Sequence, residues 1–122
     1  MSKTILIVDD SSSIRQVVGL ALKRAGYEVI QAEDGVDALS KLDGAKIHLI
    51  ISDVNMPNMD GITFVKEVKK LDGYKFTPIC MLTTESEQSR MQEGKEAGAK
   101  AWVVKPFQPP QLLDAISKLV SP

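Results

Sequence analysis

The stretch that decides the fold is Thr4-Ile5-Leu6-Ile7-Val8-Asp9-Asp10, at residues 4–10. A short apolar run of this kind is typical of a strand buried on both faces of a parallel sheet. Two acidic residues follow the run at once. Because ligands bind at the carboxyl ends of such strands, the two aspartates lie where a functional site is expected.

Four more runs of the same form occur along the chain, and each of the five precedes a helical pattern. The expected strands are residues 4–8, 28–32, 47–52, 78–83 and 101–104. The expected helices run from the serines at 11–13 to Gly26, from about 36 to 42, from about 61 to 71, roughly from 86 to 97, and onward from Pro109. Five repeated strand–helix units predict right-handed crossovers, with helices on both faces of one sheet.

Two of the helical segments have distinctive local features. Ser13 and Gln16 fit a capping box at the start of the first helix. The fourth segment, 86–97, has one good apolar anchor, Met91, and a glycine in its middle, Gly94. We interpret this segment as a weak surface helix; the alternative is a helix held loosely so that it can shift.

Length and composition predict a single domain over residues 1–122, without an output domain. Fifteen basic and sixteen acidic residues give a net charge of −1, which does not favour a nucleic-acid or membrane-surface partner. No apolar stretch approaches the ~20 residues of a membrane span, and no signal peptide is evident. The lone Cys80 lies in an apolar run, as expected for a buried thiol in a reducing compartment. We expect a cytoplasmic protein.

Charged residues stand at the ends of three expected strands. Asp9 and Asp10 follow the first, Asp53 follows the third, and Lys105 follows the fifth. Each has an ordinary alternative role: helix cap, turn residue or solvated lysine. Together, however, three carboxylates at one sheet edge repel one another unless cations join them. One lysine cannot balance three charges, so the pattern predicts a Mg²⁺ site. The only histidine, His48, lies at the other end of its strand, and we interpret it as structural.

At this point the sequence resembles the receiver domains of bacterial two-component response regulators. The residues that carry the resemblance are Asp9-Asp10, Asp53, Val54-Asn55-Met56-Pro57, Gly61, Thr83-Thr84 and Lys105-Pro106-Phe107. The match covers essentially the whole chain and is strongest to the stand-alone regulators of chemotaxis. It implies a flavodoxin-like (βα)5 three-layer sandwich with a five-stranded parallel sheet of order 2-1-3-4-5.

The resemblance also implies a role for each site residue. Asp53 would accept a phosphoryl group from the phosphohistidine of a histidine kinase. Asp10, Asp53 and the backbone carbonyl of Asn55 would bind Mg²⁺ directly, and Asp9 largely through water. Thr83 and Lys105 would contact the phosphoryl oxygens. Members of this family are not enzymes on other substrates; they catalyse only their own phosphorylation and dephosphorylation.

Signalling in the family uses a switch behind the phosphorylation site. The residue matching Thr83 moves toward the phosphoryl group, and an aromatic residue on the fifth strand turns inward. That residue is Trp102 here, where tyrosine or phenylalanine is more usual; the alternative is a fixed core aromatic. The output surface would comprise the fourth helix, fifth strand and fifth helix. Asn55, Thr84 and Glu85 are candidates for controlling access to the phosphate, and the Lys105–Pro106 bond is expected to be cis.

The implied partners are a histidine kinase, a downstream target such as the flagellar motor switch protein, and a phosphatase. We expect a monomer. A phosphorelay intermediate or a phosphate sink would have the same site. A phosphatase of the haloacid dehalogenase type is a more remote alternative, because its two aspartates are separated by one residue whereas Asp9 and Asp10 are adjacent. A flavin-binding flavodoxin is also disfavoured, since the aspartates would repel the flavin phosphate.

Overall fold

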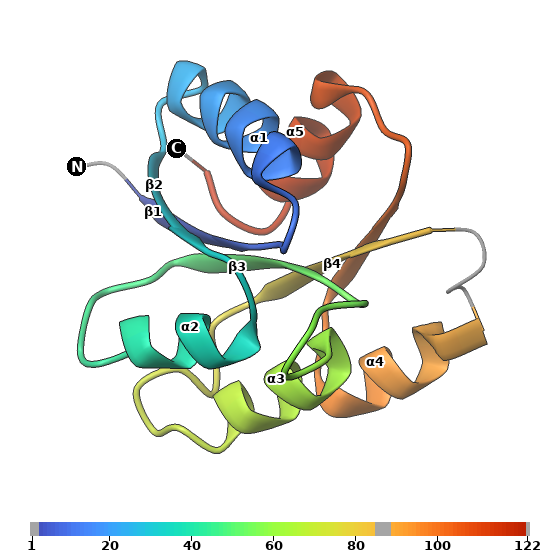
Figure 1. Cartoon of the computed structure of the whole chain (residues 1–122). Coiled ribbons are helices and arrows are strands. Elements are labelled where there is room, and N and C mark those ends of the chain that lie inside the picture. The colour runs from blue at the N-terminus through green and yellow to red at the C-terminus, as the bar shows by residue number, and fades with distance from the viewer. Residues whose placement is uncertain (1–2, 85–88, 122) are drawn as a thin grey trace.

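The computed structural model describes residues 3–84 and 89–121, and within them five strands alternate with five helices (Figure 1). The strands are β1 (Thr4–Val8), β2 (Glu28–Ala32), β3 (Leu49–Asp53), β4 (Ile79–Thr83) and β5 (Ala101–Val104). The helices are α1 (Ser12–Arg24), α2 (Gly35–Lys41), α3 (Gly61–Lys69), α4 (Met91–Ala97) and α5 (Pro109–Ser117). Every predicted strand is present, although β3 and β4 begin later than expected.

The strands form one parallel sheet of order β2-β1-β3-β4-β5, which confirms the flavodoxin-like fold. The register brings the strand ends together: Val8 pairs with Ser52, and Asp53 pairs with Leu82 on the next strand. Asp53 is therefore the last residue of β3 instead of the first residue after it. All the central strands deliver their carboxyl ends to one edge, as parallel pairing requires.

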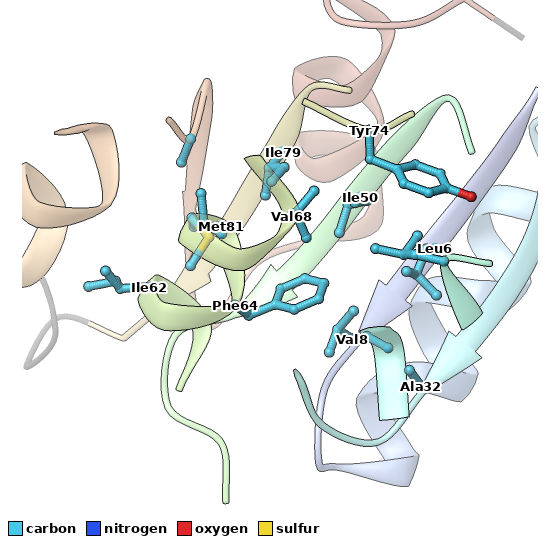
Figure 2. Packing of buried hydrophobic residues seen from close by; sticks show 14 of the residues in the cluster. Leu6, Val8, Ala32, Ile50, Ile62, Phe64, Val68, Tyr74, Ile79 and Met81 are labelled. Atoms are coloured by element: carbon cyan, nitrogen blue, oxygen red, sulfur yellow. The ribbon is translucent and has the colours of Figure 1, made fainter. Parts of the chain in front are cut away.

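Helices cover both faces of the sheet. Helices α1 and α5 lie on one face, and α2, α3 and α4 lie on the other (Figure 1). Alternate residues of β1 follow this division, since Ile5 and Ile7 belong to the cluster under α1 and α5 whereas Leu6 and Val8 belong to the other. Figure 2 shows this second cluster, in which Phe64 of α3 packs toward the sheet. Burial on both faces explains why these strands are apolar throughout.

The structure corrects the predicted cap of α1. The N-cap is Ser11, whose hydroxyl accepts a hydrogen bond from the N–H of Ile14 at 3.3 Å. The capping box expected at Ser13 and Gln16 is wrong, because the helix begins at Ser12 and Ser13 lies within its first turn. The first residue after the acidic pair has the extended backbone that a cap needs, and this places the cap two residues earlier.

Helix α4 is short. A helical turn at 89–90 leads into it, and Gly98, with φ 121°, ends it. The expected first residues of this helix, 86–88, lie outside the described part of the chain. None of the helices in the described ranges is long and apolar enough to cross a membrane.

Candidate metal centre

Three carboxylates meet at the carboxyl edge of the sheet. Asp9 and Asp10 follow β1, Asp53 ends β3, and each offers an oxygen that lies within 4.8 Å of the others. Because β1 and β3 are neighbours in the sheet, residues 44 positions apart in sequence are brought together. Asp9 is fully buried, Asp53 is 6% exposed and Asp10 is open to solvent. The cluster thus combines two buried carboxylates, Asp9 and Asp53, with one solvent-accessible carboxylate, Asp10.

Lys105 supplies the positive charge of this pocket. Its Nζ lies 3.2 Å from Oδ2 of Asp9 and 3.2 Å from Oδ1 of Asp53. Burial would lower the pKa of Lys105, but attraction to Asp53 and Asp9 outweighs it, and the pKa is raised. The ammonium is therefore charged at neutral pH. Three carboxylates against one ammonium leave an excess of two negative charges.

The donor set fits Mg²⁺. The pocket offers carboxylate oxygens, which hard divalent cations prefer, and one divalent ion would balance its excess charge. Asn55 lies two residues beyond Asp53 and is itself exposed, although its neighbours Val54 and Met56 are buried, and its backbone carbonyl is a further candidate ligand. Gly61 allows this loop to fold closely, because a Cβ at that position would overlap the backbone carbonyl oxygen of Asp53.

Asp9 is held by its own surroundings. The N–H of Ser11 donates to its Oδ1 at 2.9 Å, while its Oδ2 accepts from Lys105. The Arg15 guanidinium donates to the Asp9 backbone carbonyl at 2.6 Å. Arg15 was not singled out in the sequence, and its position one turn into α1 is the only signal that could have pointed to it. Both carboxylate oxygens of Asp9 are therefore already engaged by protein groups.

Thr83 ends β4 at the same edge and is fully buried. Its hydroxyl has no hydrogen-bond partner within the described structure. Buried polar groups are rarely left unpaired, and such a group near a charged pocket points to a functional role. The backbone N–H of Lys105 donates to the Thr83 carbonyl at 2.6 Å, so the lysine and the threonine are positioned by one hydrogen bond between neighbouring chain segments.

The remaining predicted residues that the structure describes lie outside the carboxylate cluster. Trp102 is on β5, opposite Met81 of β4, and packs partly buried against the core beneath α2, α3 and α4. Asn55 is exposed and Thr84 is half-buried, whereas Glu85 lies outside the described residues. The Lys105–Pro106 bond is cis, as expected. His48 lies at the opposite edge, where its Nδ1 accepts from the N–H of Thr4 at 3.0 Å, a structural contact.

A contact between two loops was missed in the sequence. Asn58 has a φ of 67°, and its Nδ2 donates to Oδ2 of Asp34 at 2.8 Å. Asp34 also caps α2 by accepting from the N–H of Asp37 at 2.8 Å. These hydrogen bonds to Asp37 and Asn58 outweigh burial and hold the pKa of Asp34 below its usual value. The loop that carries Asn55 is thereby tied to the start of α2.

An apolar groove of about 370 Å³ opens beside Lys105, between α1 and the segment that follows β5. Its lining comprises Ser13, Ile14, Val17, Val18, Thr84, Lys105, Pro106 and Phe107. A second groove shares Val17 and continues along α1 to Leu20 and α5. Val17 and Leu20 are 54% and 51% exposed, which is high for large aliphatic side chains.

The chain is similar to known proteins over nearly its whole length. A model of the response regulator receiver domain matches residues 5–117. The chemotaxis protein CheY1 of Helicobacter pylori is 41% identical over 114 residues, 92% of each chain. The chemotaxis protein CheY of Bacillus subtilis is 38% identical over 122 residues, 99% of this chain and 100% of that protein.

Similarity to a solved structure leads to the same family. The chemotaxis response regulator CheY4 of Vibrio cholerae superposes with a TM-score of 0.93 and 52% identity, over 98% of this chain and 100% of that chain. The matched residues 5–117 include the strand ends that carry Asp9, Asp53, Thr83 and Lys105.

Proposed function

Because the chain belongs to the family of response regulator receiver domains, signalling domains rather than enzymes, we propose that Asp53 accepts a phosphoryl group from a histidine kinase. The observation that carries the proposal is the position of the Asp53 carboxylate, 3.2 Å from Lys105 and within one carboxylate cluster with Asp9 and Asp10. A nucleophilic oxygen is there surrounded by the charges that phosphoryl transfer requires.

In the transfer, a carboxylate oxygen of Asp53 forms a bond to phosphorus, and the bond between phosphorus and the donor imidazole nitrogen breaks. The imidazole leaves with the electron pair and takes a proton, and an acyl phosphate remains on Asp53. Hydrolysis later reverses the state, when water attacks phosphorus and inorganic phosphate leaves. Lys105 balances charge on the phosphoryl oxygens, and the Thr83 hydroxyl donates to one of them.

Asp10, Asp53 and the Asn55 carbonyl would hold Mg²⁺, which supplies further charge neutralisation when bound. Asp9 fits an indirect role, since Ser11 and Lys105 already engage both of its carboxylate oxygens. We also propose that Asn55, which is exposed, and Thr84, which lines the groove beside Lys105, influence how water reaches the phosphoryl group. Glu85 belongs to the same proposal on the family resemblance alone.

We propose that phosphorylation changes the conformation of the surface formed by α4, β5 and α5. Trp102 would be the aromatic residue that switches position. Similarity to chemotaxis proteins at 41% and 38% identity supports a role in chemotaxis, in the cytoplasm, through binding of the phosphorylated domain to the flagellar motor switch protein. A phosphorelay intermediate or phosphate sink is the second candidate, because it would use the same pocket. Residues 1–122 would act as one receiver domain, which we propose is monomeric.

The first experiment incubates the protein with Mg²⁺ and acetyl phosphate and records its intact mass. We expect the wild type to gain one phosphoryl group and Asp53→Asn to gain none. Asp114→Asn, which changes an exposed aspartate in a surface ion pair with Lys118, is the matched control and should gain the group. Equal gain in Asp53→Asn, or no gain in the wild type, would refute the assignment of Asp53.

A second experiment tests the target. The phosphorylated protein and Asp53→Asn are each titrated with purified flagellar motor switch protein. We expect phosphorylation to raise the affinity about tenfold or more, within the usual range of coupling between two sites. If phosphorylation proceeds and the affinity does not change, the relay or sink becomes the better assignment.

A further inference from the structure

Gly94 of α4 lies directly against the indole of Trp102. A Cβ built at Gly94 would overlap Cη2 of Trp102 and would lie 2.5 Å from Cζ2. Real Cβ atoms essentially never approach another heavy atom more closely than 3.0 Å. No side chain larger than hydrogen can therefore occupy position 94 while the indole stays where it is.

The backbone does not require glycine at this position. Among the described glycines, positive φ values occur at Gly26, Gly44 and Gly98, and Gly94 has the ordinary conformation of a helix interior. Glycine is one of the least favourable residues in such a position. Helix α4 has only seven residues, so a glycine in its middle is a considerable disadvantage. The contact with Trp102 supplies the missing reason: the absent side chain forms a seat for the indole.

The seated indole lies on the same face of the sheet as Thr83. Trp102 pairs with Met81, and Thr83 is two residues beyond Met81 on β4, so the side chains of Met81 and Thr83 point to one face. The indole Nε1 is buried without a hydrogen-bond partner in the described structure, as is the Thr83 hydroxyl. A buried polar group without a partner requires an explanation, and here two of them lie on neighbouring strands.

We propose that Gly94 is a positioning residue: it seats the Trp102 indole and thereby couples the position of α4 to the pocket at Thr83. This inference rests on the proposed function, because a phosphorylation switch at Thr83 needs a contact that extends to the output face. The indole is rigid and rests on helix backbone, so it cannot move toward α4 without displacing the helix. If it moves away, buried backbone at Gly94 loses its cover.

The direct test uses Gly94→Ala and fluorescence. Trp102 is the only tryptophan, so emission reports on the seat alone. In Gly94→Ala we expect a red-shifted emission maximum and stronger quenching by acrylamide, because the added methyl displaces the indole toward water. The matched control is Gly19→Ala, a buried mid-helix glycine whose added Cβ would meet nothing closer than 3.3 Å, the side-chain Nε2 of Gln31. Its emission should match that of the wild type.

A double-mutant cycle separates seating from a general effect on the helix. Gly94→Ala should lower the thermal midpoint of the otherwise wild-type protein. In a Trp102→Ala background the same change should raise it, because alanine is the better helix former and nothing opposes it. Trp102→Phe provides a second background, in case Trp102→Ala does not fold, and the penalty should again disappear there. An equal decrease in all backgrounds would overturn the proposal.

Phosphorylation of the same variants tests the coupling. Intact mass after treatment with Mg²⁺ and acetyl phosphate shows whether Asp53 is modified, and therefore tests the proposed phosphoacceptor. The change in tryptophan emission on modification tests the coupling through the Gly94–Trp102 contact. We expect a spectral change in the wild type and a much smaller one in Gly94→Ala. Full modification with equal spectral changes in both proteins would overturn the coupling and leave the phosphoacceptor intact.

Discussion

The ammonium of Lys105 lies 3.2 Å from the carboxylate of Asp53, although β5 and β3 are not neighbours in the sheet. Its side chain extends past the end of β4 and also reaches Asp9, again at 3.2 Å. Only 19% of it is exposed. One largely buried cation thus links two acidic strand ends in the pocket where we propose that Mg²⁺ and a phosphoryl group bind.

Removal of this cation should change metal binding and phosphoryl transfer in opposite directions. In Lys105→Met we expect Mg²⁺ to bind about tenfold more tightly or better, since a unit charge at about 4 Å is worth ~1–4 kcal/mol. The rate of phosphorylation by acetyl phosphate should fall by about 100-fold, the usual effect of losing one stabilising donor. Calorimetric titration and intact mass measure the two effects. Lys118→Met, at an exposed ion pair, should change neither. Weaker Mg²⁺ binding in Lys105→Met would contradict this account.

Thr83→Val should stabilise the protein while impairing its switch. The hydroxyl is buried without a partner, so replacing it with a methyl group of similar size should raise the free energy of unfolding by about 1 kcal/mol. The spectral change of Trp102 on phosphorylation should shrink, since no hydroxyl remains to contact the phosphoryl oxygens. Urea unfolding and tryptophan emission measure these effects.

Ser52→Ala is the control for Thr83→Val. The Ser52 hydroxyl is equally buried but donates to the Asp53 carbonyl at 3.0 Å, so its removal should destabilise the protein instead. If Thr83→Val lowers stability as much as Ser52→Ala does, then the Thr83 hydroxyl has a partner and its proposed role is wrong.

Sequence patterns predicted the sheet and the acidic pocket because both follow from position along single strands. Apolar runs define the strands. An acidic residue at the end of such a run can be recognised from the local sequence, without knowing which distant residues it contacts. The predicted bounds of β3, residues 47–52, differ from the observed ones. Ile47 extends the apolar run across His48, yet the strand begins at Leu49 and includes Asp53. The order of strands was taken from the family resemblance, because the pattern of each strand does not reveal its neighbours.

Contacts between distant elements could not be predicted in this way. Gly94 looked like a defect in a weak helix, and its reason is the ring of Trp102 on another element. Asn58 looked like one turn former among several, yet its side chain donates a hydrogen bond to Asp34, 24 residues away in sequence. In both pairs the physical cause is a side chain from another part of the chain, and a single sequence does not record such pairings.

The contact between Asp34 and Asn58 should stabilise the protein at neutral pH and less so in acid. Asp34→Ala removes both the α2 cap and this contact, and should cost about 1–2 kcal/mol of unfolding free energy at pH 7. The folded-state pKa of Asp34 is lowered from 3.8, so its contribution is complete above that pH and is lost as the pH falls through the folded value. Urea unfolding from pH 7 to pH 3 should show the difference between wild type and variant shrinking.

Asn58 allows a matched pair of substitutions. Asn58→Gly loses the hydrogen bond to Asp34 but accepts the φ of 67° without strain. Asn58→Ala loses the same bond and also carries the steric cost of this conformation, about 1–2 kcal/mol. Alanine should therefore destabilise the protein more than glycine does. The reverse order would mean that the backbone of the loop relaxes away from this conformation.

The groove beside Lys105 should matter for phosphorylation by a protein donor and not by a small one. Any kinase that places a phosphohistidine at Asp53 must cover the surface next to the pocket, and the apolar groove along α1 shares Lys105 with it. Val17→Lys puts a charge in this groove at a side chain that is 54% exposed, so the fold should be preserved. We expect phosphorylation by the cognate histidine kinase to slow about tenfold or more, as when a charge is buried in an apolar contact.

Two comparisons make this prediction specific. Acetyl phosphate needs no docking surface, so it should phosphorylate Val17→Lys at the wild-type rate. Phe76→Lys alters a side chain that is 88% exposed and lies in the connection before β4, which enters the sheet at the edge opposite the pocket. Phe76→Lys should therefore be phosphorylated at the wild-type rate by both acetyl phosphate and the kinase. Equal slowing by Val17→Lys with both donors would place the defect in the pocket itself, and equal slowing by both variants with the kinase would mean that the groove is not where the kinase docks.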